Sequence, residues 1–216
     1  MEDPWEYYER VNPGYGKKRF SSIEIRDILI ALLIISVAFT VILVRAGNVI
    51  YADRMMNILI LFGLSALLVS TGFLLHEFAH KFVAQRYGAW AEFRMYPAGL
   101  MMALMFSFFG FLFAAPGAVY INGRIDDRMN GKISVAGPLV NIIIGGIAMT
   151  VAYTVTDDLI GWIAYWFAFF NMFLAFFNLL PIPPMDGSKI LKWNPAIYVT
   201  MIAIAFVAML SLWGFI

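Results

Sequence analysis

The chain has 216 residues, of which 62% are hydrophobic and 13% are charged, and its mean hydropathy is +0.80. A soluble domain is nearer half apolar and a quarter charged, so the composition predicts an integral membrane protein with one compact domain in the lipid bilayer. The formal net charge of +1 argues against a nucleic-acid partner, and the lack of cysteine excludes disulfides and thiolate metal sites.

The N-terminal part of the chain is polar and basic. Residues 1–27 are predicted to form a cytoplasmic segment, and residues 28–216 a single transmembrane domain. Ser21 and Glu24 have the spacing of a capping box, in which each side chain accepts a hydrogen bond from the other residue's backbone N–H. This pair predicts the start of a helix.

Five apolar runs have about the 20 residues that a helix needs to cross a bilayer. The second run leads directly into a histidine pair, and its helix is expected to continue to Tyr87 and to end at Gly88. A proline-rich stretch ends the fourth run. The five predicted spans are residues 28–44, 55–75, 131–155, 159–180 and 196–215.

The region between the second and third spans, residues 93–125, is ambiguous. Residues 98–115 are apolar for 18 positions, but prolines and glycines interrupt the run. Asn122-Gly123 is typical of a type I′ hairpin turn. We therefore predict a re-entrant or β-hairpin region, which is tolerated at membrane depth only where helices shelter its backbone.

The distribution of positive charge supports five spans over six. With five spans, every lysine and arginine except Arg45 and Arg54 lies on one side of the membrane, which the positive-inside rule makes cytoplasmic. A sixth span at residues 98–115 would move five of these residues to the other side. The predicted fold class is therefore an all-α membrane protein of about five transmembrane helices, with its N-terminus in the cytoplasm.

The two histidines of the chain lie four residues apart with a glutamate beside the first, in the sequence His76-Glu77-Phe78-Ala79-His80. Residues four apart lie on the same face of a helix, so both imidazoles can bind one metal ion, and Glu77 can reach a water on that ion. This H-E-x-x-H pattern is typical of zinc-dependent hydrolysis. An accidental match is disfavoured, because two histidines and a glutamate near hydrocarbon are costly unless a metal binds them.

Catalytic zinc usually has three protein ligands and a water, so a third ligand must come from elsewhere in the chain. With no cysteine and no further histidine, that ligand should be a carboxylate. Asp186 is the candidate, because it follows an apolar span between prolines and Gly187; the alternative is a residue that only caps a turn. A helix from Met55 to His76 rises roughly 30 Å. With five spans, the histidines and Asp186 then both lie toward the cytoplasmic side.

These residues predict a mechanism. Zinc would lower the pKa of its bound water to about 7, and Glu77 would take the proton and pass it to the leaving amine. The tetrahedral oxyanion needs a further donor. Asn141 is the candidate, because it lies within an apolar span and shares a helical face with Gly137 and Gly145. An ordinary helix–helix hydrogen bond is the alternative role for Asn141.

The chain resembles the site-2 proteases, which are intramembrane zinc metalloproteases. The resemblance covers roughly residues 55–192, the expected catalytic core. Small departures are Ala79, where many relatives have glycine, and Ser188-Lys189, where a Gly-Arg pair is common. The three motifs that carry the resemblance, in family order, are HEFAH at 76–80, AGPLVN at 136–141 and NLLPIPPMDG at 178–187.

The resemblance implies a three-helix catalytic core that cleaves peptide bonds within or near a transmembrane segment of another protein or peptide. It implies the plasma membrane of a prokaryote, with the active site toward the cytoplasmic side. The oligomeric state stays open. The implied site consists of one zinc ion bound by His76, His80 and Asp186, the catalytic base Glu77, and Asn141 as a contact to the substrate backbone.

Three alternative functions fit the sequence less well. A membrane zinc protease of another type would supply a glutamate ligand from a later helix, but the last glutamate is Glu92. A non-proteolytic zinc transporter or sensor would need a ladder of ligands across the bilayer, and the chain offers one cluster. A catalytically silent relative is disfavoured because Glu77 is intact.

Overall fold

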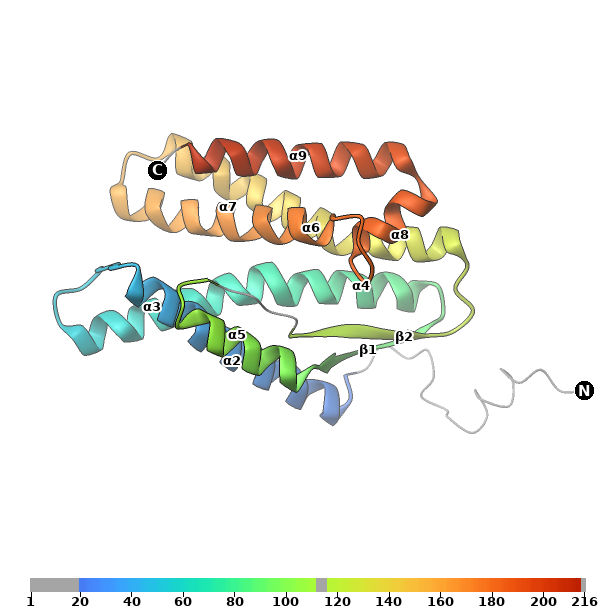
Figure 1. The fold of residues 1–216 in the computed structure, drawn as a ribbon, viewed down its shortest axis with the longest axis horizontal. Coiled ribbons are helices and arrows are strands. Elements are labelled where there is room, and N and C mark those ends of the chain that lie inside the picture. Colours follow the sequence, from blue (N-terminus) through green and yellow to red (C-terminus); the bar gives the residue numbers. More distant parts are fainter. Residues whose placement is uncertain (1–19, 112–115, 215–216) are drawn as a thin grey trace, which may run out of the picture.

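The structure is a computed structural model that describes residues 20–111 and 116–214, so the predicted segment 1–27 lies largely outside the described residues (Figure 1). The elements are α2 (Ser22–Arg45), α3 (Arg54–Val69), the π-helix η1 (Ser70–Leu74), α4 (Leu75–Arg86), β1 (Trp90–Met95), α5 (Pro97–Ser107), β2 (Gly117–Asn122), α6 (Asp127–Thr154), α7 (Asp158–Asn178), α8 (Asp186–Trp193) and α9 (Pro195–Trp213).

Five helical segments of the described chain are long and apolar enough to cross a membrane: α2, the continuous segment from α3 through η1 to α4, α6, α7 and α9. The prediction of about five spans is therefore confirmed. Helix α5 has 11 residues, and such a helix rises only about 17 Å against a hydrocarbon core of about 30 Å. A re-entrant region between the second and third spans is thus preferred over a sixth transmembrane helix.

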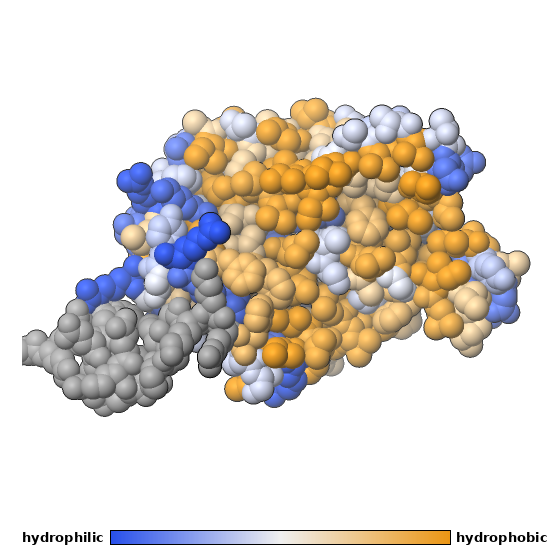
Figure 2. Space-filling model, turned by 180° about the vertical axis from the view of Figure 1, so that it is seen from behind, coloured by the Kyte–Doolittle hydropathy of each residue, from blue (hydrophilic) through white to orange (hydrophobic). Residues whose placement is uncertain are grey.

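The long helices lie side by side in two tiers. Helices α6, α7 and α9 form one tier, α2 and α5 lie in the other, and α4 lies between α6 and the strands (Figure 1). From behind, a broad apolar surface covers the length of the helices, and hydrophilic side chains gather at its ends (Figure 2). This is the distribution expected of a bundle whose sides face lipid.

The two strands form an antiparallel pair in which Phe93 lies opposite Val119. A β region between the second and third spans is therefore confirmed, but it is no tight hairpin, because α5 lies between the strands. The prediction of a hairpin turn at Asn122-Gly123 is wrong, since Asn122 ends β2 and the chain continues into α6. A two-residue turn signal is local and does not determine which strands pair.

The N-terminal end of α2 occupies the outer edge of β1. Ser21 accepts a hydrogen bond from the Glu24 N–H, so this half of the predicted capping box is present. The Glu24 carboxylate accepts instead from the Phe93 N–H at 2.9 Å, and the Asp27 carboxylate accepts from the Met95 N–H at 3.3 Å. The opposite edge of the sheet, along β2, faces α4, where the Val119 N–H donates to the Glu77 carboxylate.

Candidate metal centre

The histidine pair lies on α4, directly after the π-helical turn η1. Such turns are rare and often occur at functional sites, because they free backbone groups from the regular ladder. The middle of η1 is Gly72, and a Cβ there would lie 2.6 Å from the ring of Phe170 on α7. Glycine thus permits the close approach of α7 to the helix that carries the histidines.

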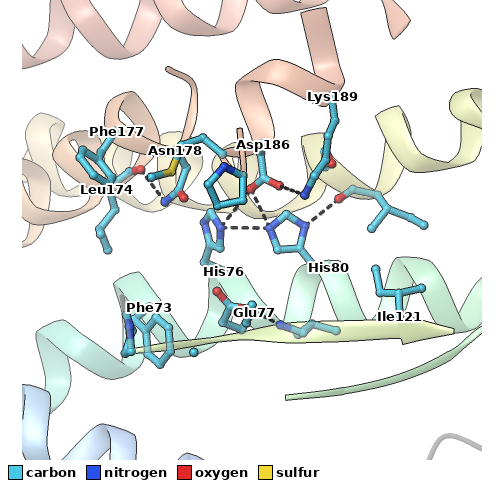
Figure 3. Close-up of a pocket in the computed structure, with 18 of the residues that line it drawn as sticks. Phe73, His76, Glu77, His80, Ile121, Leu174, Phe177, Asn178, Asp186 and Lys189 are labelled. Carbon is cyan, nitrogen blue, oxygen red and sulfur yellow. Dashed lines mark hydrogen bonds and ion pairs between the residues drawn. The ribbon is translucent and has the colours of Figure 1, made fainter. Parts of the chain in front are cut away.

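Three potential metal ligands converge between α4 and the start of α8. His76 and His80 are only 4% and 7% exposed, and Asp186 is the first residue of α8. Asp186 Oδ2 lies 3.4 Å from His76 Nε2 and 3.0 Å from His80 Nε2, and the two nitrogens are 3.0 Å apart. The two rings and the carboxylate point toward one another in Figure 3. Their ligand atoms all lie within 4.8 Å of one another.

The hydrogen bonds behind the two rings determine where the imidazole protons are. The carbonyl of Ile133, 2.8 Å from His80 Nδ1, can only accept, so His80 Nδ1 donates. The Oδ1 of Asn141 lies 2.5 Å from His76 Nδ1, and this amide is oriented because its Nδ2 donates to the Gly72 carbonyl at 2.8 Å. In the neutral rings each Nε2 therefore carries the lone pair, which is the form in which imidazole binds a metal.

This donor set fits a catalytic metal ion. Two Nε2 atoms and a carboxylate oxygen face one another, and three such acceptors repel unless a proton or a metal cation lies among them. Two histidines and one carboxylate are a known ligand set for catalytic zinc, which keeps a further position for water or substrate. The chemistry of His76, His80 and Asp186 thus fits the predicted zinc ion.

Helix α6 passes close to the ligand atoms at Gly137. A Cβ on this residue would lie 2.6 Å from His76 Nε2 and closer still to His80 Nε2. Any side chain at position 137 would therefore enter the space beside the nitrogens that could bind a metal. The absence of a side chain here keeps that space open, which is a second observation that fits a bound ion.

Glu77 lies on the β2 side of the histidine pair (Figure 3). Its Oε2 accepts a hydrogen bond from the Val119 N–H at 3.1 Å. Glu77, the three ligands, residues of β2 and Lys189 line one pocket of about 270 Å³. The Glu77 carboxylate thus lies beside β2 and shares a pocket with the three potential ligands.

Asn141 lies behind the histidine pair, where its amide forms hydrogen bonds within the protein. It is fully buried behind His76, and its two amide hydrogens go to the Gly72 carbonyl and to Asn171 Oδ1, the latter at 3.0 Å. Both amide hydrogens are engaged in this structure, which is the geometry of the alternative role, a hydrogen bond between helices; the contact to substrate stays a prediction. Sequence reasoning missed Asn171; the available signal was a polar residue inside a Phe- and Trp-rich span.

The curated proteins that this chain is similar to are named as zinc metalloproteases. The chain is 40% identical to "Putative zinc metalloprotease MJ0611" of Methanocaldococcus jannaschii over 186 residues, which are 83% of this chain and 89% of that protein. It is 30% identical to "Zinc metalloprotease MJ0392" of the same organism over 67% of this chain and 38% of that protein. It is 28% identical to "Putative zinc metalloprotease Rip3" of Mycobacterium tuberculosis over 59% of this chain and 30% of that protein. No family model and no solved structure matches the chain.

Proposed function

The chain belongs to the site-2 protease family of zinc metalloproteases, and from this premise we propose that it hydrolyses peptide bonds within or near transmembrane segments of other membrane proteins. The observation that carries the proposal is the set of three buried acceptor atoms on His76, His80 and Asp186, with Glu77 beside it in one pocket. We further propose that residues 28–216 form one transmembrane protease domain, in the plasma membrane of a prokaryote, with residues 1–27 and the site toward the cytoplasm.

In this proposal His76, His80 and Asp186 hold one zinc ion per chain. Zinc supplies, when bound, the Lewis acidity that lowers the pKa of water and polarises a carbonyl group. The carbonyl of Ile133 and the amide of Asn141 keep the two rings in the orientation that this requires. Such supporting hydrogen bonds fix the tautomer of each ligand.

Glu77 is the proton carrier of the proposed reaction. As the water oxygen bonds to the carbonyl carbon of the peptide, the Glu77 carboxylate takes one proton from that water. It then gives the proton to the peptide nitrogen as the C–N bond breaks, so the products are a carboxylic acid and an amine. In the absence of substrate, the hydrogen bond from the Val119 N–H holds the Glu77 carboxylate beside β2.

The pocket edge of β2 offers a place for an extended substrate. In an antiparallel pair, backbone groups of alternate residues point toward the partner strand and away from it. The N–H groups of Phe93 and Val119, which lie opposite each other, both point away, toward Glu24 and Glu77. By the same alternation Ile121 points its N–H away from β1, and it lines the pocket. A substrate strand added along this edge would place its backbone beside Glu77.

Replacing Ile121 by proline is expected to slow cleavage several-fold while leaving zinc content unchanged. Proline removes an outward N–H without removing a hydrogen bond to β1, and one such bond contributes about 1 kcal/mol. Initial cleavage rates of a membrane substrate measure the effect, and Ile121→Val is the matched control because it keeps the N–H. Equal rates for the proline and valine variants would count against substrate docking on this edge.

The function itself is tested with a model substrate in lipid vesicles. A helix hides its carbonyls in its own hydrogen bonds, so a substrate must unwind before it is cut. A single-span substrate with a Gly-Pro step near its cytoplasmic end should be cleaved faster than an all-leucine span, and should release its cytoplasmic tag as a soluble fragment. Efficient cleavage of a soluble unfolded protein, with the membrane substrate left intact, would refute the proposal.

A further inference from the structure

Besides a bound metal ion, the proposed reaction needs a hydrogen-bond donor for the charge that develops on the substrate; Asn130, Ser134 and Asn178 are neutral donors in the pocket lining, and Lys189 is a charged one. When water adds to a peptide carbonyl, the carbonyl oxygen gains negative charge, and a positioned donor to that oxygen is commonly worth a factor of 10²–10³ in rate. The amide hydrogens of Asn141 are both engaged elsewhere. Among the described residues that line the pocket, Lys189 is the one lysine or arginine.

Lys189 is held close to the ligand set by helix geometry. It follows Asp186 by three residues on α8, so the two side chains share one face of the helix. Lys189 Nζ lies 3.5 Å from Asp186 Oδ1, whereas Asp186 Oδ2 faces the two histidine nitrogens. The ammonium is therefore beside the metal ligands without competing for the oxygen that faces them.

The side chain of Lys189 also has freedom to move. It is 40% exposed, and the contact to Asp186 is long for a hydrogen bond. A lysine ammonium is a compact charge on a flexible four-carbon stem, so it can turn from Asp186 to a nearby substrate oxygen. Figure 3 shows Lys189 on the α8 side of the histidine pair and Glu77 on the β2 side. A peptide carbonyl between them would meet a base on one side and a cation on the other.

We propose that Lys189 is a catalytic residue of the proposed protease, and that its ammonium donates a hydrogen bond to the carbonyl oxygen of the scissile peptide as that oxygen becomes negative. Lys189 keeps its proton throughout, and Glu77 carries the proton that moves from water to nitrogen. This inference rests on the proposed proteolytic function. It differs from a positioning role, in which Lys189 would only orient Asp186 for the metal.

The matched pair for the test is Lys189→Met and Lys192→Met. Both remove one ammonium from α8 and keep a long unbranched side chain, but Lys192 is 70% exposed and pairs with Asp127 at 3.0 Å, away from the pocket lining. Each variant is purified as the full chain in lipid, and its zinc content, kcat and KM for the model membrane substrate are measured. Affinity for a phosphinic peptide is measured as well, because this anionic tetrahedral group imitates the charged oxygen without being cleaved.

Lys189→Met is expected to lower kcat about 100-fold with KM and zinc content nearly unchanged. Its affinity for the phosphinic peptide should fall by a similar factor, Lys189→Arg should recover part of the rate, and Lys192→Met should match the wild type. Loss of zinc in step with loss of rate would assign Lys189 a positioning role and overturn the proposal. So would a zinc-loaded Lys189→Met enzyme with unchanged kcat. A wild-type enzyme that holds zinc but cleaves no membrane substrate would instead refute the proposed function, and this inference with it.

Discussion

Replacing Glu77 by glutamine is expected to abolish detectable proteolysis while zinc remains bound at one ion per chain. Glutamine has nearly the same shape and keeps an oxygen that can accept from the Val119 N–H. It cannot take a proton from water, and general-base catalysis typically contributes a factor of about 10²–10⁴. Purified wild type and variant, with zinc quantified in both, are compared on the model membrane substrate.

The test requires both results in the same variant: a large loss of proteolytic activity and an unchanged zinc content. Loss of activity with loss of zinc would mean that Glu77 supports the ligand set, not the reaction. Proteolysis by Glu77→Gln at more than about a tenth of the wild-type rate would contradict the role of this carboxylate as the base.

Replacing Gly137 by alanine is expected to remove zinc and, with it, activity. The added Cβ would lie 2.6 Å from His76 Nε2 and closer to His80 Nε2, a distance that real side chains essentially never show. The ring nitrogens are held from behind by Asn141 and Ile133, so they cannot retreat without breaking buried hydrogen bonds. Zinc content of the purified variant measures the effect directly.

Gly146→Ala is the control for that substitution, because it lies on the same helix and its Cβ would meet nothing nearer than Met172 at 4.0 Å. Alanine is a better helix former than glycine by up to about 1 kcal/mol, so this control should bind zinc fully and be at least as stable as the wild type. If Gly137→Ala bound zinc as tightly as Gly146→Ala, the close packing of α6 on the site would be refuted.

Much of the fold could be predicted because the bilayer imposes a simple rule on sequence. Long apolar runs must form helices that satisfy their own backbone groups, so five spans followed from length and hydropathy. The three potential metal ligands could also be predicted from the sequence. With two histidines and no cysteine in the chain, a metal site at His76 and His80 needed a carboxylate, and Asp186 is the one that the fold places beside them.

The rest depends on contacts between distant segments, which local patterns do not encode. The strands pair across α5, so Asn122-Gly123 gave a turn signal where no hairpin forms. Glu24 was read as half of a capping box, yet its carboxylate forms a buried ion pair with Lys81 on the histidine helix. A sequence window around Glu24 contains neither Lys81 nor the strand, so the competing partner could not be foreseen.

The π-helix and the contact between Asn141 and His76 could not be predicted for a similar reason. The turn at residues 70–74 is stabilised by what packs against it, including the amide that donates to the Gly72 carbonyl. The sequence placed Asn141 on the right helical face but could not say whether its amide would meet a substrate or a histidine. In this structure Asn141 Oδ1 lies 2.5 Å from His76 Nδ1, so the amide contacts the histidine.

X-ray absorption at the zinc edge of the purified wild-type protein identifies the atoms that surround the ion, and so tests whether His76, His80 and Asp186 bind it. We expect one zinc per chain, with two imidazole nitrogens at about 2.0–2.1 Å and oxygen as the remaining neighbour. A protein that carries no stoichiometric zinc, or whose zinc has fewer than two imidazole neighbours, would contradict a site built from His76, His80 and Asp186.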